Sequence, residues 1–215
     1  MTIDRKAFIR ANTSILSPPL VPEIKLHLAH EALPIWQKTE DELGEIGLPP
    51  PFWAFAWAGG QALSRYILDT PAVVLGNSVV EIASGSGIVG IAAMKAGAAS
   101  VLSADIDLFS VAAIEANAEL NDVTLQITSE DLLAQTISNA DVILIGDLFY
   151  EKGVAERCMA WAQQAKAKGI DVIIGDPGRS YLPKHQLVKV AEYSVPVSRD
   201  LEDAEIKQTA VWRLA

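Results

Sequence analysis

The chain has 215 residues, of which 50% are hydrophobic, and a formal net charge of −10. This length and composition predict one globular, enzyme-sized domain with a sizeable core. The acidic balance and the lack of a long Lys/Arg cluster argue against a nucleic-acid partner, because binding a phosphate backbone needs several basic contacts.

Residues 1–57 lack a regular alternation of strands and helices. Apolar and polar residues alternate over 23–28, which predicts one short strand. Prolines interrupt the rest of this stretch, including Pro49–Pro51. We expect an N-terminal extension or lid that packs on a domain formed by residues 58–215.

From Gly59 onward, short apolar runs alternate with helical stretches. The predicted strands are 78–82, 100–104, 123–127, 141–146 and 171–175. Such strands with helices between them predict an α/β fold with a parallel, doubly wound, Rossmann-like sheet. The tail differs, since the extended runs 191–197 and 206–214 flank an acidic loop at 200–205. We therefore expect a mostly parallel sheet that closes with an antiparallel C-terminal strand pair.

The segment Val79–Gly87 combines an apolar strand, an acid and spaced glycines, a pattern typical of a strand that turns sharply into a helix. Gly85 and Gly87 allow backbone conformations and a close approach that a Cβ would obstruct, and the helix from Ile88 points free amides at a ligand. With Gly90 the motif reads G-x-G-x-x-G, which leaves two candidate ligands, NAD and S-adenosylmethionine.

Acids at the strand ends help to choose between these ligands. Glu81 lies four residues before Gly85, where a carboxylate can face the ammonium of S-adenosylmethionine but fits poorly beside a pyrophosphate. A capping role for this acid is the alternative. Asp105 ends the next strand and can accept the ribose hydroxyls of either ligand. Asp131 follows the third strand, where it would meet the adenine amino group or would lie in a solvated turn.

Two more acidic turns follow the next strands. Gly146–Tyr150 comes after the fourth strand and Gly175–Arg179 after the fifth, so both open at the carboxyl edge where ligands of such sheets bind. Either turn alone is compatible with a purely structural Asx turn. Together, beside the glycine loop, they favour a reaction site.

Cysteine usage and the N-terminus restrict cofactors and location. The single cysteine, Cys158, cannot form an internal disulfide and is expected to be buried in a helix over 151–168. No Cys-x-x-Cys or His cluster offers a metal site. No signal-peptide core or membrane-length apolar run is found. We expect no metal and no membrane partner, and the bacterial cytoplasm as location, or the mitochondrial matrix if the chain is eukaryotic.

These motifs resemble the seven-β-strand (class I) S-adenosylmethionine-dependent methyltransferases, and within them the branch that methylates lysines of the electron-transfer flavoprotein β-subunit. The glycine loop is shared by a very large superfamily. Narrower motifs are the run around Trp57-Ala58-Gly59-Gly60-Gln61-Ala62, the acid-x-x-aromatic of Asp147 to Tyr150, and Gly175-Asp176-Pro177-Gly178-Arg179. Two positions depart from the pattern, since Ala83 replaces the usual first glycine and Ala58 replaces a proline.

The resemblance implies S-adenosylmethionine as cofactor, with S-adenosylhomocysteine as product. It implies cofactor contacts at Trp57, Gly60, Glu81, Ala83, Ser84, Gly85, Gly87, Asp105, Ile106, Asp131 and Gly146. Asp147 and Tyr150 are the expected catalytic pair, and Trp53, Asp176 and Arg179 are expected to join them in the substrate site. Trp53 and Trp57 are equally compatible with core packing. The methyl group of Ala83 is expected to be tolerated if its backbone stays in a permitted region.

The expected function is therefore protein-lysine N-methylation, with the electron-transfer flavoprotein β-subunit as the expected protein substrate. A small-molecule amine or heterocycle N-methyltransferase is the alternative that uses the same site. An NAD-dependent oxidoreductase is disfavoured by Glu81 and by the closing strands, and a non-catalytic module is disfavoured by the presence of Asp147 and Tyr150.

Overall fold

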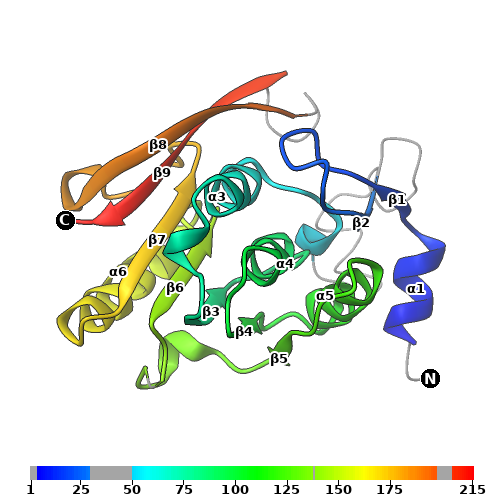
Figure 1. Ribbon diagram of the computed structural model, residues 1–215, viewed down its shortest axis with the longest axis horizontal. Helices are drawn as coiled ribbons and strands as arrows, with labels where there is room; N and C mark the ends of the chain where they lie inside the picture. The colour runs from blue at the N-terminus through cyan, green and yellow to red at the C-terminus, as the bar shows by residue number, and fades with distance from the viewer. Residues whose placement is uncertain (1–3, 30–49, 138, 198–204) are drawn as a thin grey trace.

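The computed structural model describes residues 4–29, 50–137, 139–197 and 205–215. At its centre is a seven-stranded sheet with the order β5-β4-β3-β6-β7-β9-β8 (Figure 1). The strands are β3 (Ser78–Ile82), β4 (Ser100–Ala104), β5 (Gln126–Thr128), β6 (Val142–Gly146), β7 (Asp171–Asp176), β8 (Leu187–Pro196) and β9 (Ile206–Leu214). β3 to β7 run parallel, and β9 is antiparallel to both β7 and β8. The predicted fold class is confirmed.

The predicted strands agree with the observed ones within one residue at each end, except at β5 and β8. β8 begins at Leu187, four residues before the predicted run 191–197. A strand was expected over 123–127, but β5 begins only at Gln126. Asp122 has a φ of +56°, and the N–H of Val123 donates to the carbonyl of Ala118 at 3.2 Å. These residues therefore close the end of a helix before the strand starts. The predicted acidic loop at 200–205 lies outside the described residues apart from its last position.

Helices cover both faces of the sheet (Figure 1). α3 (Ala58–Asp69), α4 (Ile88–Lys95) and α5 (Leu108–Leu120) lie on one face, and α6 (Lys152–Ala167) lies on the other. Short 3-10 turns complete the described chain at η1 (Phe52–Ala54), η2 (Pro71–Val73), η3 (Leu132–Ala134) and η4 (Lys184–Gln186). Cys158 lies in α6 as expected, and burial raises the pKa of its thiol to about 12. A thiol held neutral in this way is not a nucleophile.

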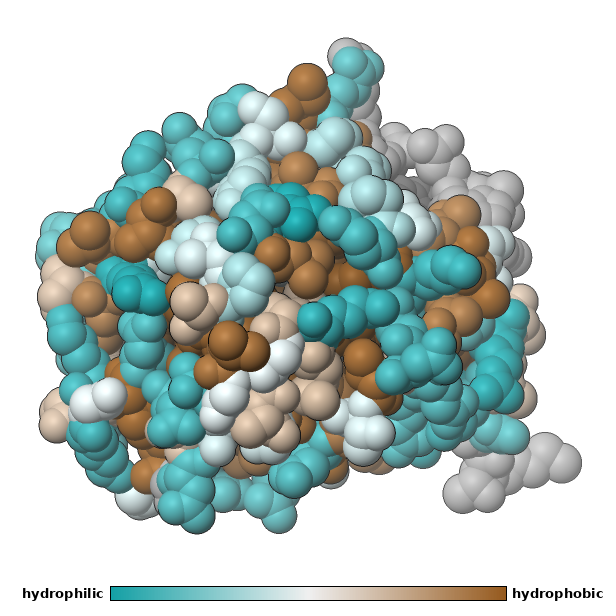
Figure 2. Space-filling view, viewed as in Figure 1, coloured by the Kyte–Doolittle hydropathy of each residue, from teal (hydrophilic) through white to brown (hydrophobic). Residues whose placement is uncertain are grey.

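Separate hydrophobic clusters fill the two sides of the sheet. One lies between the sheet and helices α3 and α4, and a second lies under α6. On the surface seen in Figure 2, hydrophilic residues occupy most of the outline and hydrophobic residues form smaller groups between them. Within the described part of the chain, no helix has the length and apolar character needed to cross a membrane.

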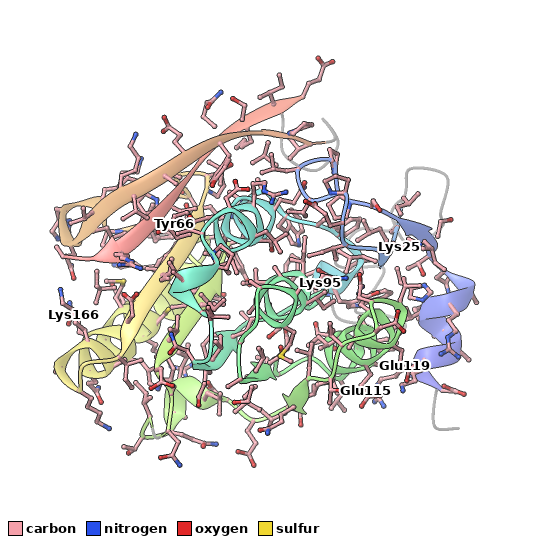
Figure 3. The ribbon with its side chains drawn as sticks, viewed as in Figure 1. Lys25, Tyr66, Lys95, Glu115, Glu119 and Lys166 are labelled. Atoms are coloured by element: carbon pink, nitrogen blue, oxygen red, sulfur yellow. The ribbon has the colours of Figure 1, made fainter. Side chains whose placement is uncertain are left out.

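The N-terminal segment contains more regular structure than predicted. α1 (Arg5–Ala11) precedes an antiparallel pair formed by β1 (Ser14–Leu16) and β2 (Leu26–Leu28), whereas the sequence predicted only one short strand. Lys6 of α1 lies 2.8 Å from Glu115 and 3.1 Å from Glu119 of α5. Figure 3 shows both glutamates on α5, close to α1. Exposed ion pairs of this kind contribute little to stability.

Two buried asparagines, one in α5 and one that caps its C-terminus, attach the N-terminal segment to the domain. Asn121 exchanges hydrogen bonds with the backbone of Lys25, at 3.0 Å to the N–H and 2.6 Å to the carbonyl. Asn117 accepts from the N–H of His27 at 2.7 Å and donates to the carbonyl of Ser86 at 2.8 Å. Because Ser86 belongs to the glycine loop, one side chain connects this loop to β2.

Candidate active site

A tight loop joins β3 to α4 at the carboxyl edge of the sheet. Ala83, Gly85 and Gly87 have φ values of +52°, +53° and +77°. The carboxylate of Asp105 accepts from the N–H of Gly85 at 2.8 Å, so the end of β4 fixes the loop. The loop leads directly into the N-terminus of α4, where backbone amides favour a polar or anionic ligand group.

Ala83 occupies the left-handed region at the position where the resemblance expects glycine. For a residue with a Cβ, this backbone conformation costs about 1 to 2 kcal/mol. The fold holds this conformation because the loop must turn sharply after β3. The substitution is accommodated at an energetic cost.

Glu81 lies beneath this loop and is only 2% exposed. Its carboxylate accepts from the hydroxyl of Ser103 at 2.6 Å and from the N–H of Gly90. Burial raises the pKa of Glu81 to about 7, although these hydrogen bonds lower it. A Cβ on Gly90 would lie 2.6 Å from both the Glu81 carboxylate and the Ser103 hydroxyl. The third glycine of the motif thus allows α4 to pack closely on the strands.

A pocket opens between this loop and the N-terminus of α3. Its walls are lined by the expected Trp57, Gly60, Glu81, Ala83, Ser84, Gly85, Gly146 and Asp147. They also include Phe55, Ile82, Ser86, Ile88 and Val89, which the sequence analysis did not single out. Ser86 and Ile88 are neighbours of the glycine motif and were recognisable by position. The apolar residues had no such signal, because their side chains look like core residues in a linear sequence.

Asp147 connects the end of β6 to α3. Its φ is +56°, a conformation that aspartate tolerates better than most residues. Its Oδ2 accepts from the N–H of Gly60 at 2.8 Å, in the first turn of α3. A Cβ on Gly59 would lie 2.6 Å from this Oδ2 and 2.2 Å from the carbonyl of Gly175. Glycine is therefore required for α3 to approach the sheet closely enough to bind this carboxylate.

The other oxygen of Asp147 binds Arg179. Oδ1 accepts from Nη2 at 2.8 Å and from Nε at 3.2 Å. The guanidinium carbon lies 5.6 Å from the ring centre of Trp57, in cation–π geometry. Burial raises the pKa of Asp147 to about 7, with Arg179 lowering it and Asp176 raising it. Asp147 thus interacts with both a helix N-terminus and a cation.

Asp176 shapes the turn that carries Arg179. Its Oδ1 accepts from the N–H groups of Gly178 and Arg179, both at 2.7 Å, which is the Asx-type turn considered from the sequence. Gly178 has a φ of +90°, so a glycine suits this turn. Asp176 is only 1% exposed, and its Oδ2 is buried without a hydrogen-bond partner in the described structure.

Four aromatic rings, which we call the aromatic rim, contact one another beside the pocket: Phe52, Phe55, Trp57 and Tyr150. The ring centre of Phe52 lies 6.1 Å from that of Trp57 and 5.7 Å from that of Tyr150. The ring centres of Phe55 and Trp57 lie 5.6 Å apart. Phe52 is 42% and Tyr150 is 47% exposed. Phe55 and Trp57 thus line the pocket, whereas Phe52 and Tyr150 are partly exposed to solvent.

Other predicted residues are not among those that line this pocket. Trp53 is 2% exposed and its ring stacks on Phe109, with centres 6.3 Å apart, so the structure places it in the core as the alternative interpretation had it. Asp131 pairs with Arg157 and accepts from the N–H of Leu133. Ile106 follows Asp105 and is 72% exposed.

Among the described residues, no group of three or more His, Cys, Asp or Glu side chains is placed to hold a metal ion.

The strand order, the glycine loop and the acids at successive strand ends define the class of Rossmann-like methyltransferases. A family model described as ribosomal protein L11 methyltransferase (PrmA) matches residues 61–147. Among solved structures, the ribosomal protein L11 methylase of Lactobacillus delbrueckii subsp. bulgaricus is 24% identical with a TM-score of 0.52, covering 75% of this chain and 81% of that one. Magnesium protoporphyrin IX methyltransferase of Synechocystis PCC 6803, solved with bound SAM, has a TM-score of 0.55 at 13% identity, covering 87% and 100%.

Similarity along nearly the whole chain identifies the family within this class. The electron transfer flavoprotein beta subunit lysine methyltransferase of Rattus norvegicus is 36% identical over 222 residues, which cover 99% of this chain and 85% of that protein. The human protein of the same name is 37% identical over 214 residues, covering 96% and 80%. The chain belongs to the family of electron transfer flavoprotein beta subunit lysine methyltransferases, and it is a methyltransferase.

Proposed function

We propose that this protein transfers a methyl group from S-adenosylmethionine to lysine side chains of the electron-transfer flavoprotein β-subunit. The similarity to lysine methyltransferases over 99% of the chain carries this proposal. The pocket supports it, because an acidic wall and a glycine loop lie beside an acid-x-x-aromatic turn at one sheet edge.

The pocket residues suit a cofactor that carries an ammonium and a ribose. When bound, S-adenosylmethionine supplies the electrophilic methyl group of its sulfonium. Glu81 lines the pocket and would face the ammonium, while it would repel a pyrophosphate. Asp105 would hold the ribose, since its oxygens keep acceptor capacity beside their bonds to Gly85 and Asp107. We further assign Gly87, Ile106 and Asp131 to the cofactor site.

The acceptor side of the site works mainly by positioning. Methyl transfer is an in-line displacement, so the amine lone pair must align with the methyl carbon and the sulfur. A lysine with an ordinary pKa of about 10.4 must also lose its proton, and the nearby sulfonium charge favours this loss. The ring of Tyr150 would orient the amine through its face or its hydroxyl. Asp147 would keep this end of the site in place through α3.

A protein substrate fits the open side of the pocket. Phe52 and Tyr150 of the aromatic rim are both nearly half exposed, so a protein surface can reach them. We also propose that residues 1–57 act as an extension of the cofactor-binding domain formed by residues 58–215. A reducing compartment, the bacterial cytoplasm or the mitochondrial matrix, stays a prediction.

Mass spectrometry of a purified electron-transfer flavoprotein tests the proposal. The flavoprotein is incubated with S-adenosylmethionine and with wild-type enzyme, Asp147→Asn or Asp171→Asn. Asp171 is the matched control, because it pairs with Arg213 at 3.1 Å at the opposite end of β7. We expect added methyl groups on β-subunit lysines with the wild type and Asp171→Asn, and at least about a hundredfold slower transfer with Asp147→Asn.

Two results would contradict the proposal at different points. An unmodified flavoprotein, with cofactor binding measured in the same sample, would exclude this substrate and redirect the search to other proteins and small amines. Near-normal transfer by Asp147→Asn would instead remove Asp147 from the mechanism. Free lysine and small amines serve as parallel substrates, and faster methylation of these would favour the small-molecule alternative.

A further inference from the structure

Both oxygens of the Asp147 carboxylate already accept hydrogen bonds within the protein. Oδ2 accepts from the N–H of Gly60 at 2.8 Å, and Oδ1 accepts two hydrogen bonds from Arg179 at 2.8 and 3.2 Å. The side chain of Asp147 is 10% exposed and that of Arg179 is 19% exposed. A lysine ammonium that approached this carboxylate would meet an acid whose charge is already matched by a guanidinium.

Several elements hold Arg179 in this position. Asp176 fixes its backbone N–H at 2.7 Å, and the Trp57 ring lies under its guanidinium. Trp57 is itself held, because its Nε1 donates to the carbonyl of Phe52 at 2.9 Å. Displacing Arg179 would break the charge-assisted hydrogen bonds and the cation–π contact together. The arrangement therefore favours an arginine that stays on Asp147 when substrate binds.

The charges around Asp147 show what this arginine does. Asp147 faces Asp176 at the end of β7 and Arg179 in the turn after it. The N-terminus of α3 lies on its other side, and Glu81 lines the same pocket. Burial and Asp176 favour the protonated acid, whereas Arg179 and the amide of Gly60 favour the carboxylate. The guanidinium of Arg179 thus stabilises the ionised form of Asp147.

We propose that Arg179 is a positioning residue for methyl transfer, which keeps Asp147 ionised and bound to α3, so that the target amine enters beside the Arg179–Asp147 pair without replacing Arg179. This inference rests on the proposed function, because it assigns roles within the same acceptor site. It predicts that the aromatic rim orients the amine, with Tyr150 beside the Arg179–Asp147 pair. It also predicts that Arg179 acts on the reaction through its contacts with Asp147 and Trp57.

The pH dependence of kcat and KM tests this role. Wild type, Arg179→Gln, Arg179→Lys and the matched control Arg213→Gln are compared with the flavoprotein as substrate and saturating S-adenosylmethionine. We expect Arg179→Gln to move the acid limb of kcat upward by about one to three pH units, the range by which an adjacent opposite charge shifts a carboxyl. Arg179→Lys should restore part of the profile, and Arg213→Gln should leave it unchanged. An equal loss at every pH, or a lower KM with kcat kept, would overturn the proposal.

Unfolding without substrate separates this inference from the proposed function. In Arg179→Gln, Asp147 should stay protonated to a higher pH in the folded state, so stability should keep falling above about pH 7, where the wild-type contribution of this group levels off. The double variant Arg179→Gln/Asp147→Asn should lose this extra slope. Identical slopes in all three proteins would refute the role of Arg179 even if the flavoprotein proved not to be the substrate.

Discussion

Replacing Glu81 by glutamine should change how the stability of the protein depends on pH. Burial raises the folded-state pKa of Glu81 from 4.5 to about 7. The folded protein therefore retains a proton that the unfolded chain releases, and this contribution to stability is lost as pH rises from the unfolded value to the folded one. Glutamine has no such proton, and its amide oxygen can still accept from Ser103 and Gly90.

The size of the effect follows from the two pKa values. A group that titrates at 4.5 when unfolded and at about 7 when folded destabilises the protein by about 2.5 kcal/mol more at about pH 8.5 than at about pH 5. Between about pH 5 and about pH 8.5, the free energy of unfolding of Glu81→Gln should therefore increase by about 2.5 kcal/mol relative to that of the wild type. Urea unfolding across this range, without cofactor, gives the difference directly.

A matched variant distinguishes this effect from general surface electrostatics. Glu156, an exposed residue of α6, is replaced by glutamine as the control, and such surface changes usually stay within about 0.5 kcal/mol. A difference between Glu81→Gln and wild type that is the same at every pH would refute the reasoning. It would mean that Glu81 is as ionised in the folded protein as in the unfolded chain.

Two further substitutions test the loop and its support. Asn117→Ala leaves the His27 N–H and the Ser86 carbonyl without their partner and should cost at least about 2 kcal/mol of stability; it should also weaken cofactor binding measured by calorimetry, and unchanged stability and affinity would contradict this linkage. Ala83→Gly should raise Tm by about 1 to 4 °C, because relief of the left-handed backbone exceeds the entropy that glycine adds to the unfolded chain. A lower Tm would show that the alanine conformation is not strained.

Local sequence determined the parts of this protein that depend on near neighbours. The glycine loop was predictable because strand, acid and glycines follow one another within Val79–Gly87. The strands were predictable because buried strands are continuous apolar runs. The closing strand pair was predictable from two extended runs around a short polar loop. β5 was misplaced because Val123 and Leu125 are apolar like strand residues but lie in and after the turn that ends α5.

Contacts between distant residues could be decided only by the tertiary structure. Gly60 and Asp147 are 87 residues apart, and Arg179 is 32 residues beyond Asp147, yet the three meet where α3 approaches the ends of β6 and β7. Nothing local to Asp147 shows that its charge is already paired. Trp53 and Trp57 likewise look equivalent in sequence, but one stacks in the core and the other lines the pocket. Strand order and helix packing decide such encounters, because they set which chain segments share one edge of the sheet.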